Sequence, residues 1–210
     1  MKIKAVIFDL DGTLLDTEEH ILASFRHATK TVLGAAPPDN ELKEMIGIPL
    51  EYQMKKLSAE HASELLETYR EHNWASCGKL IKEFPGTVQT LTTLKEQGYR
   101  LAVVTSKHTT SALRDLDLFD YTKLFEFVQG ADKTTLHKPN PEPLLAAAKA
   151  LKLKAKHCAY VGDSPYDMEA ARAAGMLAIA APWGMFALNR LLDAGAEITA
   201  NTITELPALL

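Results

Sequence analysis

The sequence predicts an α/β fold, with a doubly wound parallel sheet and an inserted domain made only of helices. Three observations support this fold class. An apolar run of strand length lies close to the N-terminus, at residues 5–8. Residues 16–84 then show helical periodicity, and short apolar runs alternate with helical periodicity from Pro85 onward. Repeated alternation of strand and helix is typical of a parallel sheet with helices on both faces.

The helical part of the pattern interrupts the sheet. Its first helix ends near Gly34, and the turn-forming residues 47–49 separate two short helices. Ser58 is suited to be the N-cap of the next and longest helix. The helices expected here cover residues 21–32, 41–46, 51–57 and 58–74. Because the first strand belongs with the later ones, we expect a core of residues 1–15 and 85–210 and a cap of residues 16–84.

The alternating part supplies the rest of the sheet. Strands are expected at residues 101–104, 125–128, 157–161 and 177–180, with 198–200 as an edge strand. Helices are expected at residues 87–97, 109–118, 141–151, 167–174 and 186–192, with a short helix in the tail. This order predicts that every later strand runs parallel to the first.

The composition narrows the function classes. The chain of 210 residues is 47% hydrophobic and 24% charged, which suits one core with an insert. A net charge of −4 and the lack of a Lys and Arg cluster argue against a nucleic-acid partner. Cys77 and Cys158 fit neither a disulfide framework nor a zinc site. With no signal peptide or apolar run of membrane length, we expect a cytoplasmic protein without a membrane partner.

Two carboxylates follow the first apolar run directly. Residues 5–8 indicate a strand buried on both faces, and Asp9 and Asp11 lie at its end. Side chains alternate along a strand, so these two carboxylates project to the same side. Gly12 then permits a sharp turn. Because buried carboxylates need a partner, a divalent cation is expected beside them.

Two alternative roles for these acids are less well supported. A strand that simply ends in a turn would leave both carboxylates solvated, and Asp-Gly turns are common. A calcium loop of the EF-hand type needs a glycine at its sixth position and a glutamate at its twelfth. Counted from Asp9, those positions hold Leu14 and His20.

Further polar residues follow the later strands. Thr105 and Ser106 follow one strand, Asp163 follows another, and Lys138 and Asp167 lie just beyond strand ends. Taken singly, each could have an ordinary structural role, as a helix cap, a solvated lysine or a first-turn acid. In a parallel sheet, however, ligands bind beyond the carboxyl ends of the strands. All these residues are expected at that one end.

The order of these residues resembles the four motifs of the haloacid dehalogenase-like phosphatases. Asp9-Leu10-Asp11-Gly12-Thr13 is similar to the first motif and Thr105 to the second. Lys138-Pro139 is similar to the third, and Gly162-Asp163-Ser164-x-x-Asp167 to the fourth. The resemblance covers essentially the whole chain and implies a Rossmann-like core with a helical cap. It also implies a phosphate ester hydrolase that requires Mg²⁺.

The resemblance implies a role for each motif residue. Asp9 would be the nucleophile that becomes an aspartyl phosphate, and Asp11 the acid and base. Thr105 and Lys138 complete the catalytic set by holding the phosphoryl group and neutralising charge. The expected substrate-binding residues are Gly12, Thr13, Ser106 and Lys107. The expected magnesium ligands are Asp9, Asp11 through its main-chain carbonyl, Asp163 and Asp167.

The position of the expected cap limits the groups within the family that this chain resembles. It resembles the cap of phosphoglycolate phosphatases, β-phosphoglucomutases and bacterial pyrophosphatases. The mutases usually carry an arginine near residues 47–49, and none occurs there in this chain. The residues in two stretches, 105–107 and 69–73, are more similar to those of phosphoglycolate phosphatases and bacterial pyrophosphatases than to those of the mutases. The expected substrate is therefore a small phosphorylated metabolite, 2-phosphoglycolate-like or pyrophosphate, and the expected assembly is a monomer or homodimer.

Three alternatives stay open at this point. One is a sugar-phosphate mutase or phosphatase similar to β-phosphoglucomutase. Another is a phospho-accepting signalling domain, although such receiver domains are shorter, have no cap and carry the accepting residue after a later strand. The third is an inactive relative that serves as a binding module, against which the complete set of motif residues argues.

Overall fold

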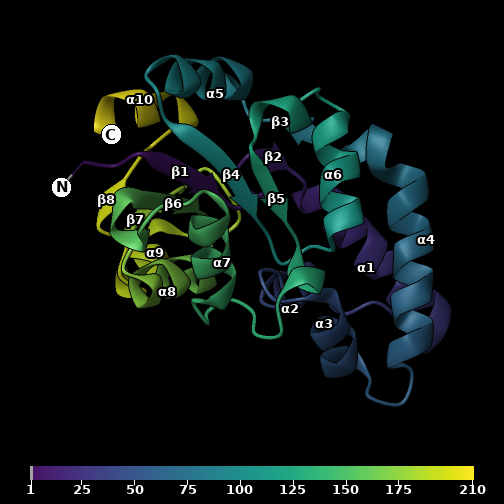
Figure 1. The fold of residues 1–210 in the computed structure, drawn as a ribbon. Helices are drawn as coiled ribbons and strands as arrows, with labels where there is room; N and C mark the ends of the chain where they lie inside the picture. The colour runs from purple at the N-terminus through teal and green to yellow at the C-terminus, as the bar shows by residue number, and fades with distance from the viewer. Residues whose placement is uncertain (1) are drawn as a thin grey trace.

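The computed structural model describes residues 2–210, and its centre is a six-stranded parallel sheet. The strand order is β5-β4-β1-β6-β7-β8 (Figure 1), and every neighbouring pair is parallel. The strands are β1 (Ala5–Phe8), β4 (Arg100–Val104), β5 (Phe127–Gln129), β6 (Cys158–Gly162), β7 (Leu177–Ala180) and β8 (Ile198–Thr199). The predicted fold class is confirmed, and β8 lies at an edge as expected.

The central strand β1 is buried on both faces, as its apolar run predicts. Val6 and Phe8 pack in one hydrophobic cluster with α5 (Thr87–Glu96) and α6 (Thr109–Asp117). Ala5 and Ile7 pack in a second cluster with α7 (Glu142–Ala150) and α8 (Pro165–Ala174). Alternate residues of one strand therefore meet helices on opposite faces, which makes the sheet doubly wound.

The remaining elements of the core are short. The helices α9 (Leu188–Asp193) and α10 (Leu206–Leu209) follow β7 and β8, respectively. Four 3₁₀ turns complete the core, at Thr122–Leu124, Ala131–Lys133, Ala155–His157 and Ile203–Glu205. None of the helices within residues 2–210 combines the length and the apolar character that crossing a membrane requires.

Four helices lie between the first strand and α5. They are α1 (Glu18–Leu33), α2 (Asp39–Lys43), α3 (Leu50–Leu57) and α4 (Ala62–Leu80), and we call them the helical segment. α1 and α4 lie side by side at one end of the sheet (Figure 1). They share a hydrophobic cluster in which the Phe25 and Tyr69 rings meet edge to face, 5.1 Å between centroids. The segment therefore has a core of its own.

The insert differs in detail from the prediction of helices alone. β2 (Leu15–Asp16) pairs antiparallel with β3 (Lys82–Glu83), where the chain leaves the core and returns to it. Strands of two residues are too short to show alternation in a sequence, so nothing in the pattern predicts them. Ser58 is not the N-cap of α4, because that helix begins four residues later. Its hydroxyl instead accepts a hydrogen bond from the main-chain N–H of His61, at 3.2 Å.

We expect the helical segment to depend on its buried aromatic pair. Phe25→Ala should lower the free energy of unfolding by about 3–5 kcal/mol, because the cavity left behind adds to the lost burial. Leu33→Ala is the control on the same helix; its side chain is 38% exposed, so we expect a loss below about 1 kcal/mol. Urea unfolding followed by circular dichroism measures both, and equal losses would contradict a core centred on Phe25.

Candidate active site

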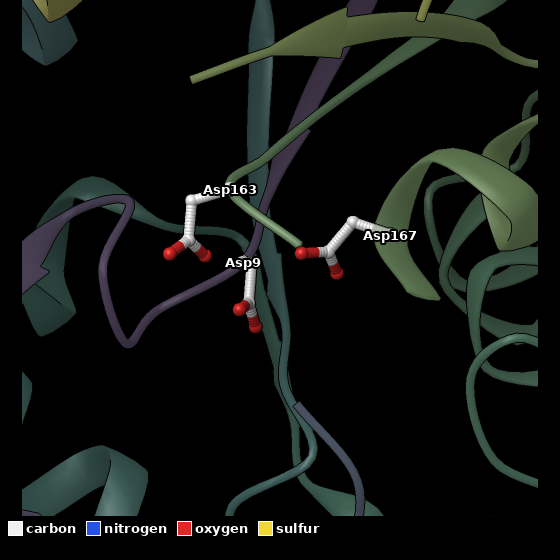
Figure 2. Close-up of side chains that lie close together, drawn as sticks. All are labelled: Asp9, Asp163 and Asp167. Atoms are coloured by element: carbon white, nitrogen blue, oxygen red, sulfur yellow. The ribbon is translucent and has the colours of Figure 1, made fainter. Parts of the chain in front are cut away.

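Three aspartates meet at the carboxyl ends of β1 and β6. Asp9 follows β1, Asp163 follows β6, and Asp167 lies in the first turn of α8. All three are buried, and each offers a carboxylate oxygen within 4.8 Å of the other two (Figure 2). β1 and β6 are paired neighbours, so their ends deliver Asp9 and Asp163 to the same place. The predicted convergence of these side chains is what the structure shows.

Asp167 is held by the cap of its own helix. Its Oδ2 accepts hydrogen bonds from the main-chain N–H of Ser164 at 3.0 Å and from the Ser164 hydroxyl at 2.6 Å. The Ser164 hydroxyl also accepts from the Asp167 main-chain N–H, which completes a capping box. These bonds leave Oδ1 of Asp167 directed toward the cluster.

Asp163 is fixed by backbone that approaches it closely. Its Oδ2 accepts a hydrogen bond from the main-chain N–H of Met185 at 2.7 Å. Gly12 has a φ of +77°, and a Cβ there would lie only 2.2 Å from Asp163 Oδ2. The Thr13 hydroxyl is 3.4 Å from the other carboxylate oxygen. Gly12 and Thr13, expected to bind substrate, therefore lie against Asp163, and that role stays a prediction.

Lys138 lies among the carboxylates as a buried cation. Its Nζ is 3.0 Å from Asp9 Oδ1 and 2.5 Å from Asp167 Oδ1. It also donates to the Tyr160 hydroxyl at 3.1 Å, and that hydroxyl donates to the main-chain carbonyl of Val104 at 2.8 Å. One ammonium faces three carboxylates, so an ionised cluster would carry two uncompensated negative charges.

The burial of these charges changes how readily they ionise. Burial raises the pKa of Asp9 to about 7, although the Lys138 ammonium acts in the opposite direction. Burial also raises the pKa of Asp163 well above its usual value, and the neighbouring Asp167 and Asp9 add to the rise. A carboxylate cluster with this deficit of positive charge is stabilised in its ionised form by a further cation.

The cluster has the donor set that a divalent metal requires. All three side chains offer hard oxygen ligands, which suit Mg²⁺. Oδ1 of Asp9 is buried, and its close polar neighbour is the Lys138 ammonium at 3.0 Å, so a carboxylate oxygen with two lone pairs keeps one available for a metal ion. The cluster is made of Asp9, Asp163 and Asp167. For Asp11 the sequence predicts only a main-chain ligand, and this stays a prediction.

The Asp11 carboxylate has a different partner. Its Oδ1 lies 2.7 Å from Nζ of Lys107, and the same Nζ lies 2.6 Å from Asp115 Oδ2. The two aspartates of the first motif are thus paired with different lysines, Asp9 with Lys138 and Asp11 with Lys107. Lys107 was expected to bind substrate, and the structure shows that its ammonium is already engaged by two carboxylates.

Thr105 and Ser106 form the turn that follows β4. The Thr105 hydroxyl accepts a hydrogen bond from the main-chain N–H of Lys107 at 3.2 Å. The Ser106 hydroxyl donates to the main-chain carbonyl of Gly47 at 2.7 Å, which links the sheet end to the helical segment. Both residues line the same cavity as Asp9 and Asp11.

That cavity lies between the strand ends and the helical segment. Its volume is about 580 Å³, within the range of pockets that hold small molecules. One wall carries the motif residues at the strand ends. The opposite wall comes from the helical segment and is largely apolar; it includes Ile46, Ile48, Leu50, Tyr52, Tyr69 and Trp74. A substrate held there would contact both parts of the chain.

Several residues of the site were not expected from the sequence. Tyr160 stands within an apolar strand run, where a tyrosine usually indicates packing rather than a contact with a lysine. Arg114 and Asp115 stand in a helix, and nothing in their spacing indicates that they lie beside Lys107. Ser164 is different, because Ser164-x-x-Asp167 is a recognisable capping pattern that predicts its contact with Asp167.

Comparisons with known proteins agree with this site. A family model described as haloacid dehalogenase-like hydrolase matches residues 6–181. Pyrophosphatase PpaX from Halalkalibacterium halodurans is 39% identical over 176 residues, which are 84% of this chain and 82% of that protein.

Two solved structures extend the agreement to the whole fold. A haloacid dehalogenase-like family hydrolase from Streptococcus pneumoniae is 28% identical with a TM-score of 0.87, covering 99% of this chain and 98% of its own. A predicted phosphoglycolate phosphatase from Haemophilus somnus covers 100% of this chain and 98% of its own, with a TM-score of 0.89. Its 24% identity supports the fold alone. The expectation of a phosphate ester hydrolase is confirmed, and the chain belongs to the haloacid dehalogenase-like hydrolase family.

Proposed function

We propose that the protein is a magnesium-dependent phosphatase that hydrolyses a small phosphorylated compound through an aspartyl phosphate on Asp9. The observation that carries this proposal is the double position of Asp9. It belongs to the buried carboxylate cluster, and it also lines the cavity beside Asp11. A nucleophile that attacks an anionic phosphate needs both a cation to offset its charge and access to the substrate.

The first chemical step uses both aspartates of the first motif. A carboxylate oxygen of Asp9 attacks phosphorus and forms a new P–O bond, while the bond from phosphorus to the leaving oxygen breaks. Asp11 gives its proton to that leaving oxygen. The products of this step are the free alcohol, or orthophosphate from pyrophosphate, and the aspartyl phosphate.

The second step releases phosphate. Asp11, now ionised, takes a proton from a water molecule whose oxygen attacks phosphorus. The bond from phosphorus to the Asp9 oxygen breaks, and orthophosphate leaves. Asp11 is thus protonated again and ready for the next cycle.

The remaining motif residues stabilise charge in both steps. Lys138, 3.0 Å from Asp9 Oδ1, offsets negative charge on the nucleophile and on the transferring group. Thr105 lies at the end of the neighbouring strand β4 and would hold a phosphoryl oxygen through its hydroxyl. Lys138 is held by Asp9, Asp167 and Tyr160, and Thr105 follows a strand of the sheet, so little reorganisation is needed as charge develops.

Magnesium would be held by Asp9, Asp163, Asp167 and the main-chain carbonyl of Asp11. When bound, the ion supplies the positive charge that lets the Asp9 carboxylate approach an anionic phosphate. The charge deficit of the cluster and the remaining lone pair on Asp9 Oδ1 support this assignment.

Pyrophosphate is the substrate that the comparisons favour, because the relative from Halalkalibacterium halodurans, which is 39% identical, is named a pyrophosphatase. 2-Phosphoglycolate is the second candidate. The loop at residues 47–49 lines the cavity and carries no arginine, which weighs against a sugar-phosphate mutase. We also propose that residues 16–84 act as a cap over a core of residues 1–15 and 85–210. The cytoplasmic location and the monomeric or homodimeric state stay predictions.

Phosphate release from a substrate panel tests the proposal directly. The panel contains pyrophosphate, 2-phosphoglycolate, hexose phosphates and 4-nitrophenyl phosphate. We expect turnover of at least one compound, and Asp9→Asn should abolish it because the amide cannot form the intermediate. Asp193→Asn removes an exposed carboxylate and should leave the rate unchanged. Near-normal turnover by Asp9→Asn would refute the mechanism.

Asp11 is tested with two aryl phosphates that differ in their leaving groups. Phenolate is a poor leaving group and needs a proton, whereas 4-nitrophenolate departs without one. Asp11→Asn should therefore lower kcat for phenyl phosphate by roughly 10²- to 10⁴-fold. With 4-nitrophenyl phosphate we expect an initial burst of nitrophenolate, because only the second step is impaired. Equal losses on both substrates without a burst would show that Asp11 is not the acid.

Removal of the metal should stop turnover. We expect no activity after chelation, and recovery on addition of Mg²⁺. Asp163→Asn removes one ligand charge, so the Mg²⁺ concentration for half-maximal activity should rise by about tenfold or more. Asp193→Asn again serves as the control. Activity that survives complete chelation would argue against a metal at the Asp9 cluster.

A further inference from the structure

A line of alternating charges connects Asp11 to the helical segment. Lys107 Nζ lies between Asp11 Oδ1 and Asp115 Oδ2, at 2.7 and 2.6 Å. The Arg114 side chain donates from Nε to Asp115 Oδ1 at 2.7 Å and from another nitrogen to Asn73 Oδ1 at 3.0 Å. Arg114 and Asp115 belong to α6 and Asn73 to α4, so the line runs from the strand end into the helical segment.

Asp115, in the middle of this line, is held in place by contacts with both of its charged neighbours. Asp115 is fully buried. Burial alone would raise its pKa, but Lys107 and Arg114 hold that pKa below its usual value. Two nitrogens of the Arg114 side chain contact Oδ1 of Asp115. The Arg114 guanidinium also lies over the ring of Trp74, 4.9 Å from its centroid. The two contacts of Arg114 with Asp115 restrict the carboxylate to one orientation.

The anchor in α4 is buried as well. Asn73 is 5% exposed, and its main-chain carbonyl accepts a hydrogen bond from Nε2 of the buried His20 at 2.8 Å. The Asn73 side chain also donates toward the Ser24 hydroxyl at 3.4 Å. His20 and Ser24 belong to α1, so Arg114 is tied to the two longest helices of the helical segment.

Asp115 does not line the cavity, whereas Lys107 and Asp11 do. It therefore acts on bound substrate only through its neighbours. An ion pair used only for stability could lie anywhere on α6. This one instead ends on the carboxylate that donates and accepts the proton in the proposed function.

We propose that Asp115 is a positioning residue of the reaction, oriented by Arg114. It holds the Lys107 ammonium at a fixed point, and Lys107 in turn holds the Asp11 carboxylate beside the leaving oxygen. The Asp11 carboxylate accepts a hydrogen bond from Lys107 at 2.7 Å, so the position of that ammonium bears directly on its orientation. This inference rests on the proposed role of Asp11 and adds a residue that nothing in the motif pattern indicates.

The proposal predicts a loss that depends on the leaving group. Asp115→Asn keeps the size of the side chain but removes the charge that holds Lys107. We expect kcat for phenyl phosphate to fall by roughly 10- to 100-fold, because a displaced acid transfers its proton poorly. With 4-nitrophenyl phosphate we expect an initial burst of nitrophenolate followed by slower turnover, because its departure needs no proton, whereas a displaced Asp11 also activates water less well in the second step. The matched control is Asp117→Asn, which lies on the same helix but is exposed.

A purely structural role gives a different result. Asp115→Asn would then lower the two rates equally without a burst of nitrophenolate, or lower only the melting temperature, and either result overturns the proposal. If Asp115→Asn does not fold, as judged by circular dichroism, Arg114→Gln takes its place. It removes the two contacts of Arg114 with Asp115, so it should produce the same loss on phenyl phosphate and the same burst with 4-nitrophenyl phosphate. An equal loss on both substrates without a burst refutes the inference.

The Asp11→Asn variant separates this inference from the proposed function. If Asp11→Asn shows no dependence on the leaving group, either in rate or in the burst, or if the wild-type protein hydrolyses none of the panel compounds, the proposed function fails first. If Asp11→Asn shows that dependence and the Asp115 and Arg114 variants do not, only the positioning role is refuted.

Discussion

The structure depends on the burial of three carboxylates around one ammonium at the end of the central strand. Charges buried without partners are costly, so Asp9, Asp163 and Asp167 can share this place only with extensive support. Lys138 supplies one positive charge, and main-chain N–H groups together with the Ser164 hydroxyl satisfy the outward oxygens. What remains is a deficit of positive charge at one point. That deficit suits a divalent cation better than any side chain nearby.

The parallel sheet makes this concentration of charge possible. β1 is flanked by β4 and β6, and all three strands end on the same side, so residues far apart in sequence meet there. The apolar clusters on the two faces hold the strands in place, and the hydroxyl of Tyr160 in one of them also contacts Lys138. The motif aspartates then divide between two environments. Asp9 lies with Lys138 in the buried cluster, and Asp11 lies with Lys107 at the cavity wall. Two carboxylates two residues apart can thus take different roles.

Much of this arrangement could be predicted because it depends on local patterns. The run before Asp9 is recognisable as a buried strand, and residues after strand ends in a parallel sheet must gather at one edge. Contacts between side chains of different helices leave no such pattern. Asn73, Arg114 and Asp115 look like ordinary polar residues on helical faces, yet they meet because α4 lies beside α6. The pairing of β2 with β3 was also missed, since its strands have only two residues each.

The charge pairs also determine which cation of the cavity is available to a substrate with a second negative group, such as pyrophosphate. Three Lys and Arg side chains line the cavity, namely Arg70, Lys107 and Arg114. Lys107 and Arg114 are bound to the buried Asp115, and withdrawing either one would leave that charge poorly compensated. Arg70 pairs with Glu51, and both side chains are about half exposed, so this pair can be broken at little cost. Of the three cations, Arg70 is therefore the one most easily freed to contact an additional anionic group.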